Sequence, residues 1–395
     1  MTAALDSRPV YLDYAATTPL APEALAAMQA VYRSETVVGN PSSPHPAGCR
    51  AAAILEDARA SIARLISAQP DEILFTSGAT EANNLALRGG ASFRAHRGRH
   101  VVTVATEHKA VLESAAALQD DGFAVTVLRP DSLGRVSPDA LEAALRDDTT
   151  LVSIMHVNNE TGVIQDIDGL SHLCRERSIV FHCDAAQSAG KLPIDVSQCP
   201  IDLLSLSAHK MYGPQGVGAL YVRRRPGVGV DRQTVGGSQE GGLRAGTEPV
   251  ALIAGFAAAA DLAAARMPED LEHVQALATR LWQGLESIGG LRRNGCADAI
   301  YPGIVNVSVP DVDGESLTFD LEPLCIATGS ACNSQSAEPS FVLKAMGCSD
   351  LEAQGAIRLS FGRYSTMADI EAAVSRFRHA VQRLRAIAEP CADGS

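Results

Sequence analysis

Short apolar runs alternate with longer amphipathic segments along the first 265 residues. Seven of these runs have the length and composition of strands, at 72–76, 100–104, 124–128, 151–156, 179–183, 203–207 and 219–222. Apolar positions at helical spacing lie between several of them, at 81–88, 110–119 and 137–146. This alternation predicts an α/β fold with a mostly parallel seven-stranded sheet. Ligands of such sheets bind beyond the carboxyl ends of the strands, so functional residues are expected there.

The pattern changes after residue 265. An Ala-rich apolar stretch at 250–265 predicts a buried helix, and a second helix is expected over about 269–288. Shorter elements follow: strands at 303–309 and 356–360, and helices at 340–346 and 367–387. We therefore predict a large domain over 16–265 and a smaller α+β domain made of 1–15 and 266–395.

Composition narrows the functional classes. Hydrophobic residues make up 46% of the 395 residues and charged residues 20%, which is typical of a soluble globular protein. The net charge of −13 argues against a generic binder of nucleic-acid backbones. No apolar run reaches the ~18 residues of a membrane span, and the N-terminus has no apolar signal core. We therefore expect a cytoplasmic protein that binds neither nucleic acid nor membranes directly.

The nine cysteines are scattered and form no CxxC pair, so neither a zinc ribbon nor a thioredoxin-type motif is indicated, and no metal site is expected. In a reducing cytosol most of them should be plain buried thiols.

Three polar segments stand at predicted strand ends. Residues 76–82 are small and hydroxyl-rich and lead into a helix, which fits either a phosphate-binding helix start or an ordinary Ser/Thr cap. Asp184 ends one strand and could cap a helix or pair with a protonated ring nitrogen. Lys210 follows 26 residues later, after the strand at 203–207. It is one of only four lysines, against 29 arginines. Asp184 and Lys210 should therefore lie on the same edge of the sheet.

A lysine, a buried acid and a phosphate cradle are what pyridoxal 5'-phosphate (PLP) requires: a Schiff-base partner, a carboxylate on the pyridine nitrogen, and donors for the phosphate. The acid keeps the ring nitrogen protonated, because opposite charges favour each other's charged form. Ser207, His209 and Thr80 could serve the cradle.

With these residues in view, the chain resembles a cysteine desulfurase, a fold-type I PLP enzyme of the class V aminotransferase family. The similarity runs from residue 11 to residue 363. It is carried by motifs in order: YLDYAATTPL, GNPSSPHPAG, FTSGATEANN, TEHKA, HVNNETGVIQDI, FHCDAAQSAGK, SAHKMYGPQGVGALY, LRAGTEP, TGSACNSQSAEPS and RLSFGR.

The resemblance implies roles for individual residues. Lys210 matches the Schiff-base lysine, and His108 matches a histidine that stacks on the cofactor ring and moves protons. The remaining cofactor contacts implied are Ala79, Thr80, Asn159, Asp184, Gln187, Ser207, His209 and Thr247. Thr247 matches a contact that reaches in from a second subunit, which implies a homodimer. Arg358 matches the arginine that binds the substrate carboxylate, with Asn40 assisting.

Cys332 lies in a run of small polar residues at 327–336, unlike a cysteine that packs in a core. It matches the nucleophile that takes sulfur from L-cysteine as a persulfide, which requires a thiolate; His108 or the bound substrate would remove its proton. The resemblance is to the long-loop subgroup, whose members pass sulfur to an acceptor or scaffold protein for iron–sulfur clusters, tRNA thiolation or DNA phosphorothioation. One departure is Gly241, where the family usually has arginine.

Two other kinds of function compete with this prediction. A selenocysteine lyase or another class V enzyme would keep the PLP site and change the reaction, although Cys332 argues against an aminotransferase. A non-catalytic scaffold would keep only the fold, which the presence of Lys210, Asp184, His108 and Cys332 disfavours.

Overall fold

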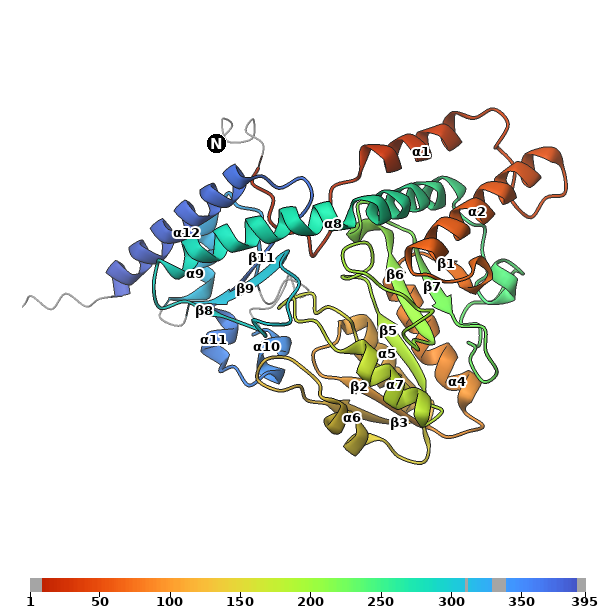
Figure 1. Cartoon of the computed structure of the whole chain (residues 1–395), viewed down its shortest axis with the longest axis horizontal. Helices are drawn as coiled ribbons and strands as arrows, with labels where there is room; N and C mark the ends of the chain where they lie inside the picture. Colours follow the sequence, from red (N-terminus) through yellow and green to blue (C-terminus); the bar gives the residue numbers. More distant parts are fainter. Residues whose placement is uncertain (1–8, 310–311, 329–338, 389–395) are drawn as a thin grey trace, which may run out of the picture.

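The computed structural model describes residues 9–309, 312–328 and 339–388. They form a large α/β part and a smaller α+β part that lie side by side, joined along the long helix α8 (Val250–Glu286) (Figure 1).

The large part is built on a seven-stranded sheet in the order β1-β7-β6-β5-β4-β2-β3. Its strands are β1 (Ile73–Thr76), β2 (His100–Val104), β3 (Ala124–Leu128), β4 (Thr149–Ser153), β5 (Val180–Asp184), β6 (Leu203–Ser207) and β7 (Gly218–Val222). The strands from β6 to β3 pair in parallel, and β7 is antiparallel to both its neighbours. The predicted fold class is confirmed. Strands such as β2 and β5 are buried along their whole length, as expected of parallel strands covered on both faces.

Helices cover this sheet. They are α1 (Pro22–Arg33), α2 (Pro46–Leu65), α3 (Ala79–Asn84), α4 (Gly90–Arg94), α5 (Lys109–Asp120), α6 (Pro138–Ala144) and α7 (Ile167–Glu176). Helices α3 and α4 are continuous through a π-helical turn, Leu85–Gly89. A 3₁₀ turn, Ala208–Lys210, follows β6 directly.

The smaller part contains an antiparallel sheet in the order β10-β11-β9-β8. Its elements are β8 (Arg292–Arg293), β9 (Ile304–Ser308), α9 (Gly314–Leu321), β10 (Ala327–Thr328), α10 (Phe341–Ala345), α11 (Asp350–Gln354), β11 (Ala356–Ser360) and α12 (Met367–Ala388). Tyr11 and Asp13 form single bridges with Cys325 and Ser360, so the start of the chain joins this sheet. The division at 16–265 itself stays a prediction.

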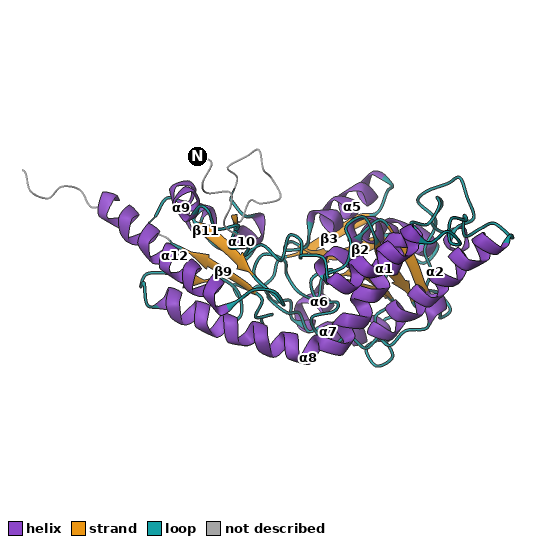
Figure 2. Cartoon of the chain, turned by 90° about the horizontal axis from the view of Figure 1, so that it is seen from above, coloured by secondary structure: helices purple, strands orange, loops and turns teal. Residues whose placement is uncertain are grey.

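Helix α8 contributes to both hydrophobic cores. Its first half, with Ile253 and Phe256, packs into the core of the large sheet, and its second half, with Leu277 and Leu281, packs into the core of the small one. Figure 2 shows it extending from beside α1 to beside α12. In the described chain it is also the one helix whose length and apolar composition would suffice to cross a membrane, and 44% of its most apolar window is buried inside the protein. These contacts make it a core helix.

The sequence predicted two helices where the structure has one. Pro268 lies inside α8, and its missing N–H favours a break there. The two halves nevertheless remain one helix, because each is packed into its own core.

Candidate active site

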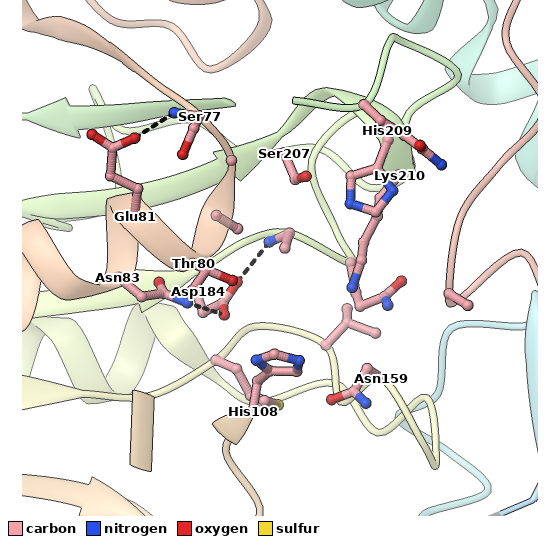
Figure 3. Close-up of a pocket in the computed structure, with 18 of the residues that line it drawn as sticks. Ser77, Thr80, Glu81, Asn83, His108, Asn159, Asp184, Ser207, His209 and Lys210 are labelled. Atoms are coloured by element: carbon pink, nitrogen blue, oxygen red, sulfur yellow. Dashed lines mark hydrogen bonds between the residues drawn. The ribbon is translucent and has the colours of Figure 1, made fainter. Parts of the chain in front are cut away.

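A pocket of about 430 Å³ opens at the carboxyl ends of β5 and β6, the edge where the sequence predicted ligand chemistry (Figure 3). The predicted site residues that line it are Ala79, Thr80, His108, Asn159, Asp184, Gln187, Ser207, His209 and Lys210. The parallel pairing of β5 with β6 is what brings Asp184 and Lys210 to one edge, as predicted.

The Asp184 carboxylate is held from two sides. Asn83 Nδ2 donates to its Oδ2 at 2.7 Å, and the backbone N–H of Ala186 donates to its Oδ1 at 2.9 Å. Asp184 is only 6% exposed. Hydrogen bonds to a carboxylate stabilise its charged form, so this geometry keeps an anion at the base of the pocket.

A second buried acid, Glu107, lies near Asp184 in a less polar environment. Burial, together with the charge of Asp184, raises the pKa of Glu107 well above its ordinary value. Its Oε1 accepts a hydrogen bond from the Met155 N–H at 2.7 Å, while Oε2 is buried and has no partner among the described residues. Glu107 therefore favours its protonated form more than an exposed glutamate does, whereas Asp184 receives the two hydrogen bonds that suit a carboxylate.

Lys210 extends into the pocket from the turn after β6, on the side opposite Asp184 (Figure 3). Beside it, the His209 ring contacts Thr17 Oγ1 through Nδ1 at 3.1 Å. Burial and the nearby Lys210 lower the pKa of His209 to about 4. His209 is therefore a neutral donor at physiological pH, and Lys210 carries the amine chemistry of this wall.

His108 begins α5 and points its ring into the pocket (Figure 3). Its Nδ1 accepts the backbone N–H of Ala110 at 3.1 Å, so in the neutral ring the proton lies on Nε2. Burial, followed by the charge of Lys210, lowers the pKa of His108. Near pH 7 it thus presents an N–H donor, and it can take up a proton only by giving up the bond to Ala110.

The part of the pocket formed by the start of α3 and the end of β6 can hold an anion. Gly78 starts α3 with φ of 152°, and no side chain caps that helix end. The hydroxyl of Ser207 is buried on the pocket wall without a hydrogen-bond partner in the described chain. Uncapped N–H groups and an unsatisfied hydroxyl are donors that a phosphate would satisfy.

Behind Asn159, the arginine predicted to bind the substrate carboxylate lies on β11. Arg358 Nη1 donates to the backbone oxygen of Asn159 at 2.9 Å, and Nη2 pairs with Asp13 Oδ1 at 2.7 Å. Its Nε is buried without a partner among the described residues. Arg358 is not one of the residues that line the pocket, but it lies one contact behind the wall.

Two other predicted residues, Asn40 and Thr247, do not line the pocket. Asn40 is exposed, and its Oδ1 accepts the N–H of Ser42 at 2.9 Å. Thr247 is exposed, and its role across a subunit boundary stays a prediction. Cys332 lies outside the described residues.

Two residues of the site were missed from the sequence. Asn83 lies three residues after Thr80, so helical spacing would have placed both on one face of α3. For Glu107 there was no signal, because an acid next to His108 in a polar motif gives no sign that packing will bury it.

The residues present fit PLP. The pocket offers an amine, a fixed carboxylate and an anion cradle on separate walls, and the buried, unpartnered Ser207 hydroxyl lies in the cradle. Among the described residues, no group of three or more His, Cys, Asp or Glu side chains is placed to hold a metal.

Comparison with known proteins agrees with this site. The family model described as aminotransferase class-V matches residues 10–373. Cysteine desulfurase IscS of Vibrio vulnificus (strain CMCP6) is 49% identical over 378 residues, which are 95% of this chain and 94% of that protein. A NifS-like protein superposes with a TM-score of 0.88 at 35% identity, covering 95% of this chain and 100% of that one. A structure described as SspA in complex with cysteine gives 0.78 at 40% identity, covering 90% and 99%.

The family match spans nearly all of the described residues, including both strand ends that form the pocket. The chain therefore belongs to the aminotransferase class-V family, and within it to the PLP-dependent cysteine desulfurases.

Proposed function

We propose that the pocket at the ends of β5 and β6 is where this cysteine desulfurase binds PLP and converts L-cysteine to L-alanine, with the sulfur passing to Cys332 and then to an acceptor protein. The observation that carries the proposal is that Asp184 and Lys210 both line one pocket, and that Asn83 donates a hydrogen bond to the Asp184 carboxyl group.

When bound, the cofactor supplies an electron sink that stabilises negative charge at the substrate Cα and allows the bond from Cβ to sulfur to break. The chain's own residues do the rest. Asp184 keeps the ring nitrogen protonated, Lys210 provides the amine that holds the cofactor, and the Ser207 and Thr80 side of the pocket receives the phosphate. Gln187 and Asn159 complete the lining near the ring.

The proposed sulfur transfer needs two reactants, L-cysteine and the Cys332 thiol, and no external oxidant or reductant. The Cys332 thiolate bonds to the substrate sulfur as the Cβ–S bond breaks, and the carbon that loses sulfur gains a proton. The products are L-alanine and a persulfide. Because the proton of neutral His108 lies on Nε2, His108 offers a hydrogen bond to the bound groups. It can carry a proton only after Nδ1 releases the Ala110 N–H, and either His108 or the bound substrate would remove the thiol proton.

A substrate carboxylate would bind at Arg358, whose buried Nε has no partner in the described chain. Asn40 would assist only if its segment approaches the pocket. Among the relatives, the structure of SspA contains cysteine, which supports a cysteine-sized substrate.

A homodimer and a cytoplasmic location are parts of the same proposal. Thr247 is exposed and does not line the pocket of its own chain, which supports the proposal that it acts in a partner's pocket. All seven described cysteines are free thiols, as expected in a reducing compartment. The acceptor is a sulfur-accepting or scaffold protein, with iron–sulfur assembly, tRNA thiolation and DNA phosphorothioation as alternatives. Selenocysteine lyase is the competing activity.

The test uses purified full-length protein reconstituted with PLP. The wild type should show the visible absorbance of a lysine-bound cofactor and release alanine from L-cysteine in step with sulfane sulfur. Lys210→Ala should lose that absorbance band. Cys332→Ser should keep it and lose persulfide formation. A Lys210→Ala protein that retains the band, or a Cys332→Ser protein that releases sulfur at the normal rate, would refute the assignments.

A further inference from the structure

Glu160 is a buried acid next to the pocket for which the reaction above has no use. It directly follows the pocket-lining Asn159 and is 6% exposed. Its backbone is fixed by Asn158, whose Oδ1 accepts the N–H groups of Glu160 and Thr161, each at 2.9 Å. From the small sheet, Asn306 Nδ2 donates to the Glu160 carbonyl at 3.2 Å. The carboxyl group is thus held on a rigid support.

The carboxyl group contacts the residue that begins α10. Ser340 Oγ donates to Glu160 Oε2 at 2.6 Å, and the same hydroxyl accepts the N–H of Leu343 as the N-cap of α10. Ser340 is 2% exposed. With Pro339, it is where the described chain resumes after the stretch that contains Cys332, eight residues earlier in the sequence.

The other end of that stretch reaches the same neighbourhood. Strand β10 (Ala327–Thr328) pairs with β11 so that Ala327 lies opposite Arg358. Arg358 in turn donates to the Asn159 carbonyl, next to Glu160. Both ends of the stretch carrying Cys332 are therefore fixed within a few residues of the group that would hold the substrate carboxylate.

The charge state of Glu160 affects this contact. Burial raises its pKa to about 7, against the lowering effects of the Ser340 hydrogen bond, Arg358 on β11 and Lys109 on α5. A hydroxyl donates a stronger hydrogen bond to a carboxylate than to a neutral carboxyl group. The contact with Ser340 should therefore be strongest above neutral pH.

We propose that Glu160 is a positioning residue that fixes, through Ser340, the C-terminal end of the stretch carrying Cys332, so that the thiol meets the substrate sulfur at the pocket. This inference rests on the proposed role of Cys332. Neither Glu160 nor Ser340 touches substrate; they act by limiting where the thiol can go. Because misplacing a reactive group by about 1 Å can cost ~100-fold in rate, loss of this contact should slow sulfur transfer strongly.

The experiment separates two steps of the PLP-loaded, full-length enzyme after mixing with L-cysteine. The change in cofactor absorbance reports substrate binding and does not need Cys332. Persulfide formation requires Cys332. The persulfide is trapped with an alkylating reagent and quantified by mass spectrometry. We expect Ser340→Ala to slow persulfide formation tenfold or more and to leave the absorbance change unaltered, while Ser340→Thr, which keeps the hydroxyl, restores the rate.

The matched control is Ser349→Ala. Ser349 caps α11, a helix as short as α10, but bonds Glu352 instead of Glu160. It should behave as wild type, which shows that loss of a helix cap alone is not the cause. In addition, wild-type persulfide formation should slow as pH falls through 7, and Glu160→Gln should remove that inflection.

The outcomes are distinguishable. A Ser340→Ala enzyme that forms persulfide at the normal rate, or that slows both steps equally, would overturn the positioning role. Cys332→Ala serves as the reference: release of alanine and sulfane sulfur at the wild-type rate by that variant would refute the proposed function itself, whatever the Ser340 variants do.

Discussion

At the residue scale, the site holds two buried acids in different environments. Asp184 accepts two hydrogen bonds, whereas Glu107 accepts one and its burial raises its pKa well above the ordinary value. Asp184 and Lys210 could be predicted because strand ends and a rare lysine are visible in the sequence. The partners Asn83, Glu107 and Glu160 could not, because only three-dimensional packing decides which polar side chain is buried against which.

Asn83→Ala should weaken PLP binding. It removes a 2.7 Å hydrogen bond to a buried carboxylate, an interaction of about 1.5–3 kcal/mol, so the PLP dissociation constant should rise roughly 10- to 100-fold. Equilibrium titration of the apoprotein with PLP measures it. Asn84→Ala is the control, because Asn84 bonds only the Thr80 carbonyl of its own helix. Equal effects in both variants would contradict the role given to Asn83.

Glu107→Gln should make stability less sensitive to a rise in pH above ~4.3. The folded pKa is raised, so the native state retains a proton that the unfolded chain loses above its ordinary pKa of ~4.3; wild-type stability therefore falls as pH rises, by up to ~1.4 kcal/mol per unit. Gln is neutral and keeps the oxygen that accepts from Met155. Urea unfolding at pH 5 and pH 8 measures the free energy of unfolding of both proteins. The stability of the variant relative to wild type should be higher at pH 8 than at pH 5. A constant difference would mean that Glu107 is ionised in the fold.

At the element scale, the strands of the large sheet were predictable and the irregular pieces were not. All seven strands appear within a few residues of their expected positions, because parallel strands are continuous apolar runs. The two-residue strands β8 and β10 carry too little sequence to form a pattern. Helices α1 and α2 were missed because their apolar stripes are largely alanine, which gives weak contrast with the polar face.

Close packing of two elements limits what can stand at the start of β7. A Cβ on Gly218 would lie 2.5 Å from the Leu206 carbonyl oxygen and 2.7 Å from Gly78 Cα, just before α3 and the proposed phosphate cradle. Gly218→Ala should cost about 1–3 kcal/mol in the free energy of unfolding and weaken PLP binding, because Gly78 must move. In Gly90→Ala the new methyl would meet only leucine methyls at 3.1 and 3.2 Å, so PLP affinity should be unchanged. Urea unfolding and PLP titration of both variants test this prediction, and equal PLP affinities in the two variants would contradict it.

At the scale of the whole molecule, a buried ion pair ties the second half of α8 to the active-site side. Arg363 Nε donates to Asp270 Oδ2 at 2.8 Å, and its guanidinium lies 4.2 Å from the ring centroid of Tyr212, two residues after Lys210. These contacts could not be predicted from the sequence, because Arg363 is 93 residues from Asp270 and 151 residues from Tyr212 along the chain.

Asp270→Ala should destabilise the protein by about 3 kcal/mol, because it leaves the Arg363 charge, on a side chain 5% exposed, without its partner. Thermal and urea unfolding of the holoenzyme measure this loss. Arg266→Ala removes a more exposed arginine from the same carboxylate and should cost less than 1 kcal/mol. Similar losses in the two variants would show that the pair with Arg363 is not the important one.

The unpaired cysteines have a consequence for an enzyme that handles reactive sulfur. Burial raises the pKa of Cys174, Cys183, Cys199 and Cys348, so these side chains remain protonated and poorly nucleophilic at neutral pH. If Cys332 carries the sulfur, as we propose, these four thiols are poor acceptors for it, and none of the described cysteines forms a disulfide. Transfer of the sulfur to an external acceptor is then favoured over transfer to these thiols of the same chain.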